Sequence, residues 1–185
     1  MHVIDAIETR RAYRSLDPVE ITDELIRDLA RCAGLSASCF NYQPWRFVFV
    51  RDSGVLEEIH GALSKNNNWI QDAAMIIAVF SRKEDDCVIR DREYHTFDVG
   101  MAVAFMMLRA TELGLVAHPV AGFSPKKVRG ILGLPGDMQV ITLVNVGVHA
   151  DTLHEKLTEQ QKQVELVRPE RLPFEKYAYI DRYTG

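Results

Sequence analysis

The stretch Ser36–Arg51, SASCFNYQPWRFVFVR, decides how the chain is organised. Its first half is small and polar, whereas Trp45–Val50 alternates aromatic and β-branched residues, which predicts a buried strand. Pro44 favours extended backbone at Gln43 and is tolerated at the start of a strand. The sequence therefore predicts a polar loop held rigidly by a core strand, an arrangement suited to ligand binding. An ordinary helix-to-strand connection fits the same pattern.

Helical and extended patterns alternate on both sides of this stretch. Apolar spacing, caps and glycine stops predict helices over Val3–Thr9, Thr22–Ala33, a segment that starts at Asp52 or Ser53, Tyr94–Leu113, Ser124–Gly133 and Asp151–Leu166. Apolar runs of strand length predict strands at Ala73–Phe80, Leu115–Val120 and Met138–Val148. The charged segment Ser81–Asp91 is expected to be exposed.

Composition limits the classes of function. The chain has 185 residues, 47% of them hydrophobic, which is enough for one domain with a real core. Its net charge of −4, from 22 basic and 26 acidic residues, gives no support to a nucleic-acid or anionic-membrane partner. The first residues lack the apolar run of a signal peptide, and no run reaches the roughly 18 residues that span a bilayer. We therefore expect a cytoplasmic protein.

Cysteines and histidines give no metal-site pattern. Cys32, Cys39 and Cys87 are odd in number and form no Cys-x-x-Cys pair, so we expect neither a disulfide framework nor a zinc site. With no base to activate it, Cys39 is interpreted as a small packing residue rather than a nucleophile. His149 and His154 have no third ligand near them in sequence, and we interpret both as surface histidines.

Three arginines lie within five residues after the first predicted helix: Arg10, Arg11 and Arg14. A guanidinium group is permanently charged and suited to bidentate phosphate contact, so the cluster is a candidate anion site. A solvated basic run fits the same pattern. A nucleic-acid arm is a further alternative, which the acidic remainder of the chain disfavours.

The predicted helix Tyr94–Leu113 is apolar on nearly every side. Such a helix must be covered all round. A large subunit interface would cover it, and so would a central position within one subunit.

Six stretches, in this order along residues 10–175, resemble the nitroreductase family of FMN-dependent oxidoreductases. They are Arg10–Arg14, Ala37–Trp45, Asn66–Ala73, Asp98–Ala102, Ala121–Phe123 with its following turn, and Arg168–Glu175. The chain departs from the family pattern at four positions. Ala12 replaces a serine, Ala37 a proline, Cys39 a small alanine or serine, and Pro169 a lysine.

The resemblance implies an α+β fold in which helices flank a central mixed sheet, and a homodimer with FMN shared between subunits. Residues 1–185 would form one domain, with the tail 167–185 wrapped over the surface or the partner subunit. One chain would hold FMN through Arg10, Arg11, the backbone of Ala12, Arg14, Asn66, Ala121, Gly122 and Arg171, with Arg168 compensating for the missing lysine. The other chain would supply Ala37, Ser38, Cys39 and Asn41.

The activity implied by the resemblance is reduction of a nitroaromatic, quinone or flavin acceptor by NADH or NADPH in a ping-pong reaction. The flavin would carry the chemistry, so no catalytic side chain and no metal are expected. A flavin-cleaving or reductive-dehalogenating enzyme of the same family is an alternative. A non-catalytic FMN-binding regulatory protein is another. The short segment before Tyr94 argues against a large lid.

Overall fold

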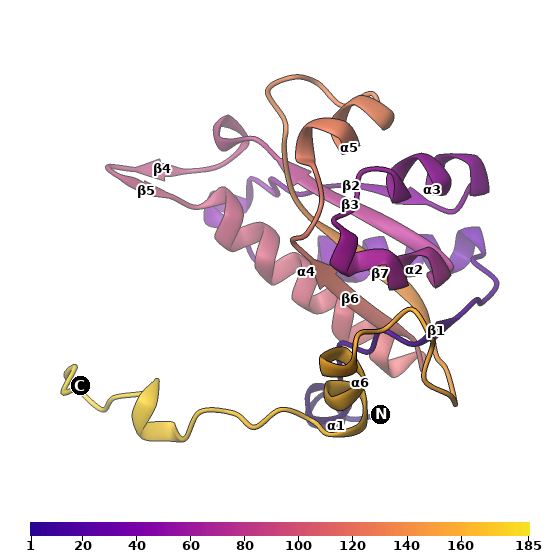
Figure 1. Cartoon of the computed structure of the whole chain (residues 1–185). Coiled ribbons are helices and arrows are strands. Elements are labelled where there is room, and N and C mark those ends of the chain that lie inside the picture. Colours follow the sequence, from indigo (N-terminus) through magenta and orange to yellow (C-terminus); the bar gives the residue numbers. More distant parts are fainter.

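Strand β7, Gln139–His149, is the centre of the sheet in the computed structural model, which describes residues 1–185 (Figure 1). It pairs with β1 (Leu16–Asp17), β3 (Met75–Ser81) and β6 (Val116–Val120), and β3 pairs in turn with β2 (Arg46–Val50). All these pairings are antiparallel, so the prediction of a mixed sheet is wrong for the single chain. A helical connection follows β2 and another follows β6. In each case the next strand, β3 or β7, pairs with the strand before the connection and runs in the opposite direction.

Helices cover both faces of this sheet, which confirms the predicted α+β class (Figure 1). Side chains of β3 alternate between the two faces, as the period of a strand requires. Met75, Ile77 and Val79 pack with α2 (Asp23–Gly34) and α4 (His95–Glu112). Ile76, Ala78 and Phe80 pack with α3 (Ser53–His60), α5 (Pro125–Ile131) and the 3₁₀ segment η2 (Lys65–Asp72).

Local signals fixed the starts of several helices. Helix α1 spans Val3–Thr9, as predicted. The Thr22 hydroxyl accepts a hydrogen bond from the backbone N–H of Leu25 at 3.1 Å and caps α2. Ser124 caps α5 in the same way, with Pro125 at the first helical position.

Four segments differ from the sequence-based expectation. Strand β2 lies at the sheet edge and is only half buried, so it is not a core strand. Strand β1 was missed because it has two residues, too few for a periodic signal. Only Glu159–Leu166 of the predicted last helix is helical (α6). The segment Ser81–Asp91 is not uniformly exposed, because Ser81, Asp86 and Cys87 are buried.

The remaining short elements lie around this frame. They are η1 (Cys39–Asn41), η3 (Lys83–Asp85), the hairpin strands β4 (Val88–Ile89) and β5 (Arg92–Glu93), and η4 (Phe174–Lys176). His154 is not a surface residue: Nδ1 lies 3.2 Å from an Asp72 carboxylate oxygen and Nε2 3.5 Å from one of Asp17. These acidic partners lie far away in sequence, which is why spacing alone did not reveal them.

One side of α4 remains uncovered within the chain. Phe97 and Phe105 are 61% and 47% exposed, although Val99 and Met106 of the same helix are buried. Helix α1 likewise exposes Val3, Ile4 and Ile7, whereas its Ala6 is buried. After α6 the tail 167–185 runs away from the body (Figure 1). No helix combines the length and the apolar character needed to cross a membrane.

Candidate functional site

The arginine cluster follows the end of α1 and is held by the last turn of α6. The Arg11 guanidinium donates to the carbonyl oxygens of Val164 (2.7 Å) and Glu165 (3.0 Å). These carbonyls belong to the end of a helix, where they lack intrahelical partners. The backbone N–H of Arg14 donates to the buried Glu165 carboxylate at 2.6 Å. Arg11 therefore has a structural role that the sequence did not reveal.

A cavity of about 220 Å³ opens beside this cluster. Its wall contains no acidic residue and is formed by Arg10, Arg11, Ala12, Arg14, Val164, Arg168, Pro169 and Arg171. The structure thus places in one cavity wall all the candidate FMN-binding residues that were predicted in segments 10–14 and 168–171. Burial lowers the pKa of Arg10, and the positive charges of Arg168 and Arg171 lower it further. Like charges gathered around one hollow repel each other, and a bound anion would relieve this repulsion.

Arg168 has a second role in this wall. Its guanidinium donates to the backbone carbonyl oxygens of Glu8 and Arg10. It thereby ties the start of the tail to the end of α1, beside the missing lysine position. Arg10 and Arg171 make no such hydrogen bond or ion pair, so their guanidinium groups are available to a ligand.

A second cavity, of about 350 Å³, adjoins the first and shares Arg14 with it. Asn66, Ala121 and Gly122, all predicted from sequence, line it. The other seven lining residues were not predicted: Ser64, Asn67, Trp69, His118, Pro119, Val120 and Gln161. Arg14 thus lies between a cavity lined by five arginines and a cavity in which it is the only charged lining residue apart from the titratable His118.

The Gly122 turn is crowded by its own neighbours. Its carbonyl accepts hydrogen bonds from the Ser64 backbone and from the Asn67 amide, each at 2.9 Å. A Cβ at this position would lie 2.5 Å from Asn67 Nδ2 and 2.6 Å from Ser64 Oγ, so any other residue here would displace one or both of these side chains. The N–H groups of Ala121 and Gly122 have no acceptor in the protein. They are donors left for a ligand, as is the N–H of Ala12.

His118 is the site residue that sequence reasoning missed most clearly. It lies in β6 and is 6% exposed, and its Nδ1 lies 2.9 Å from the Tyr13 carbonyl oxygen. Its ring centroid is 4.7 Å from that of Trp69. Burial, the largest cause, together with the charges of Arg14 and Arg10 lowers the pKa of His118 to about 4. A histidine inside the apolar run Leu115–Val120 was the available signal.

The other predicted residues, Ala37, Ser38, Cys39 and Asn41, do not line either cavity. Their loop lies by the first turn of α4, where the Asp98 carboxylate accepts the Cys39 backbone N–H at 2.6 Å. Helix α1, which leads into the arginines, packs near the other end of α4 (Figure 1). One chain therefore does not unite the two predicted sets, and a second chain would be needed to do so.

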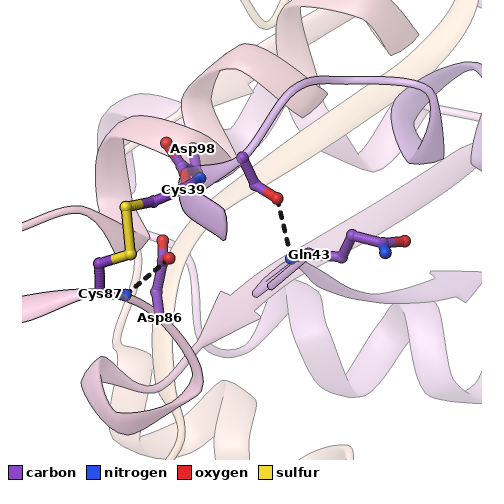
Figure 2. Close-up of a disulfide and its surroundings, with 6 residues drawn as sticks. Cys39, Gln43, Asp86, Cys87 and Asp98 are labelled. Carbon is purple, nitrogen blue, oxygen red and sulfur yellow. Dashed lines mark hydrogen bonds between the residues drawn. A yellow bond between two sulfur atoms is a disulfide. The ribbon is translucent and has the colours of Figure 1, made fainter. Parts of the chain in front are cut away.

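Cys39 forms a disulfide with Cys87, which corrects two expectations (Figure 2). Cys39 is not a packing residue, and an odd cysteine count did not exclude a disulfide, because Cys32 alone remains unpaired. The two partners are 48 residues apart, a separation that carries no motif. Spacing rules for cysteine pairs apply to short local motifs and could not reveal it.

Comparisons with known proteins agree on one family. The model of the family described as "Nitroreductase family" matches residues 7–67 and 56–148. A protein named putative NADH dehydrogenase/NAD(P)H nitroreductase, from Methanothermobacter thermautotrophicus, is 26% identical over 96% of this chain and 88% of its own. The NADH dehydrogenase of Thermus thermophilus is 24% identical over 77% of this chain and 84% of its own.

Solved structures give the same result for the fold. One described as an oxidoreductase containing FMN has a TM-score of 0.85 and 26% identity, covering 97% of this chain and 92% of its own. An FMN-dependent nitroreductase from Clostridium difficile has a TM-score of 0.74 and covers 97% of this chain and 99% of its own. At 19% identity the second shows the fold alone.

Proposed function

Because the chain belongs to the nitroreductase family, we propose that it is an FMN-dependent oxidoreductase that takes electrons from NADH or NADPH. Nitroaromatics, quinones or flavins would accept them in a ping-pong reaction. FMN, when bound, supplies hydride transfer at its ring. The observation that carries the proposal is a cavity lined by five arginines and no carboxylate, joined through Arg14 to a cavity with unpaired backbone donors. A cytoplasmic location stays a prediction from composition.

The residues present fit the two ends of FMN. Arg10 and Arg171 would contact the phosphate, because neither is neutralised by a protein carboxylate. Arg14 and Asn66 would lie along the pyrimidine edge, and the N–H groups of Ala121 and Gly122 would face acceptors of the ring. Ala37, Ser38, Cys39 and Asn41 of a second chain would complete the site. No side chain of this set is needed as an acid, base or nucleophile.

The absorbance spectrum of the purified protein, followed by anaerobic mixing with NADH or NADPH, tests this function. Flavin bands close to one per chain and rapid bleaching by a nicotinamide are expected. Bound flavin that neither nicotinamide reduces would favour the regulatory alternative. A protein that binds no FMN when FMN is added in excess would contradict the proposal. Product analysis would distinguish acceptor reduction from flavin cleavage or dehalogenation.

We propose a homodimer, with the exposed faces of α4 and α1 at the interface and the tail 167–185 wrapped over the partner. Phe97, Phe105 and the apolar residues of α1 are exposed in the single chain. The tail also exposes Leu172, Phe174, Tyr177 and Ile180, which a partner surface would cover. This arrangement would place the Cys39 loop of one chain near the arginines of the other.

Phe105→Glu is expected to convert the dimer to monomer and to release FMN, because it buries a charge in an apolar interface. Leu153→Glu is the matched control, since Leu153 is 38% exposed and lies outside the proposed interface. Sedimentation velocity of both variants, with absorbance at a flavin wavelength, measures mass and cofactor together. A stable monomer of the wild-type chain that retains FMN would contradict the shared site.

Arg14→Gln is expected to retain most of its FMN and to lower the two-electron midpoint potential by about 30–60 mV. Reduction adds negative charge to the pyrimidine edge, and a cation about 4 Å away contributes up to about 4 kcal/mol at an effective dielectric of 20. Solvent screening reduces this, and about 30 mV corresponds to about 1.4 kcal/mol for a two-electron couple. A redox titration beside wild type measures the shift. An unchanged potential would show that Arg14 does not face the ring.

A further inference from the structure

The Cys39–Cys87 disulfide joins two segments that are distant in sequence (Figure 2). Cys39 begins η1 in the loop Ser36–Gln43, and Cys87 lies in the segment that leads into α4. Cys39 is half buried and Cys87 is 7% exposed. A solvent-open cavity of about 390 Å³ is lined by Asp86 and Cys87 and by the exposed residues Phe40 and Tyr42. A small molecule can therefore approach the disulfide from this side.

Two buried carboxyl groups flank the bond (Figure 2). Asp86 is 8% exposed, and a carboxylate oxygen of it lies within 4.8 Å of both sulfur atoms. Its Oδ1 accepts the Cys87 backbone N–H at 2.7 Å, while Oδ2 has no donor from any N–H or hydroxyl of the protein. Asp98 is 1% exposed and accepts the Cys39 N–H. Each sulfur-bearing residue is thus tied to its own buried acid.

Asp86 retains its proton at higher pH than an exposed aspartate does. Burial is the largest cause of its raised pKa, and the charge of Asp98 and a hydrogen bond with that residue raise it further. The Cys87 N–H and the charge of His95 act in the opposite direction. A proton retained on Asp86 lies close to the disulfide, because an oxygen of this carboxyl group is within 4.8 Å of both sulfur atoms.

The loop that the disulfide anchors has an unfavourable backbone. Phe40, Asn41 and Gln43 have φ values of 46°, 59° and 51°, which side-chain-bearing residues rarely adopt. Such conformations persist only where the surroundings impose them. Here the restraints are the disulfide, the Asp98 bond to Cys39, and the Ser38 hydroxyl, which accepts the Gln43 N–H at 3.0 Å. Loss of the disulfide would remove the only covalent one.

We propose that Cys39–Cys87 is a reversible thiol–disulfide site whose substrates are small dithiols, and that Asp86 donates a proton to the departing Cys87 sulfur. A dithiol thiolate attacks Cys39 Sγ, because Cys39 is the more exposed of the two residues; a new S–S bond forms and the Cys39–Cys87 bond breaks. The Cys87 thiolate takes the Asp86 proton, and the Asp86 carboxylate regains a proton from solvent. The second thiol of the reductant loses its proton to solvent and displaces Cys39 as a thiolate, which takes a proton from solvent. The dithiol loses two electrons and becomes a disulfide, and two protein thiols form.

Reduction releases the loop Ser36–Gln43 from its covalent anchor. This consequence rests on the proposed function, in which the loop of one chain contacts the FMN of the other. The dithiol form is then expected to bind FMN more weakly than the disulfide form. The thiol chemistry itself does not depend on that assignment, so the two can be tested apart.

Thiol counting by alkylation and mass spectrometry on the intact, FMN-supplemented protein gives the first test. The oxidised protein should show one reactive thiol under denaturing alkylation, Cys32, and the protein treated with dithiothreitol under native conditions should show three. Three thiols in the oxidised protein would refute the bond. A disulfide that dithiothreitol reduces only after denaturation would refute the reversible site.

Asp86→Asn tests the proton donor. In a series from about pH 5 to pH 8, it should slow reduction by dithiothreitol most at the acidic end, by about tenfold. This factor is smaller than the roughly hundredfold or more that is usual for a general acid, because a thiolate is a good leaving group even without a proton. The ratio of wild-type to variant rates should shrink as pH rises, since Asp86 then loses its proton. Glu84→Gln is the control, because Glu84 is exposed in the same cavity wall. A ratio near one, or a ratio independent of pH, would overturn the assignment.

Hydrogen exchange completes the test. On reduction, the amides of Cys39 and Gln43 should exchange faster, while those of β2 should not change. Unchanged exchange in the loop would overturn the anchoring role. Faster exchange with unchanged FMN affinity would instead contradict the placement of this loop at the partner's flavin, and the thiol chemistry would stand.

Discussion

Arg10→Ala is expected to weaken FMN binding about tenfold to a hundredfold. A charge-assisted hydrogen bond contributes about 1.5–3 kcal/mol, which sets this range. Arg10 is suited to such a contact because its guanidinium has no carboxylate partner and lies with Arg168 and Arg171 around one cavity. Burial and the two neighbouring charges lower its pKa, so a phosphate would relieve an existing repulsion.

Titration of the flavin-free protein with FMN, followed by flavin fluorescence, measures the effect. Arg27→Ala is the matched control, because Arg27 lies exposed on α2, far from the cavity wall, and makes no ion pair. Arg171→Ala should resemble Arg10→Ala. If both retain FMN with wild-type affinity, the cluster is a solvated basic run and the phosphate assignment fails.

Much of the fold could be predicted from local chemistry. Thr22, Ser124 and Pro125 marked helix starts because a cap acts on the next few residues. The run Ala73–Phe80 predicted β3 because burial on both faces removes polar residues from a strand. Strand order was not accessible in the same way. Only long-range pairing decides that β2 lies at the edge and that β7 contacts three strands.

Local sequence indicated candidate residues where side chains act singly, but it did not reveal roles that depend on distant partners. Arg10, Arg14 and Arg171, which the family resemblance assigned to one flavin site, line one cavity, and their contacts with FMN stay predictions. The Asn67 amide, however, donates to the Gly122 carbonyl oxygen. Because three asparagines are adjacent at 66–68, the sequence alone could not indicate which of them makes this contact. The roles of Cys39 and Arg11 depend on Cys87 and on the end of α6, 48 and more than 150 residues away. No periodic or motif signal links such pairs.

His118 should make the folded state strongly sensitive to mild acid. Its pKa of about 4 in the folded protein lies below the ordinary value of 6.5, so between these values the unfolded chain binds a proton that the folded chain does not. The stability that neutral His118 contributes is therefore complete above pH 6.5 and is lost as pH falls towards 4. At about 1.4 kcal/mol per pKa unit, the loss is about 3 kcal/mol.

His118→Asn isolates this contribution. Asparagine can still donate an N–H to the Tyr13 carbonyl but does not titrate, so its loss of contact with Trp69 is the same at every pH. Urea unfolding of the flavin-free protein at pH 7 and pH 4.5 gives the free energy of unfolding of each form. Wild type should lose about 2–3 kcal/mol more than the variant over this interval. Parallel losses would mean that folding does not lower the pKa of His118, and that the cavity it lines carries a second cation beside Arg14 at about pH 4.5.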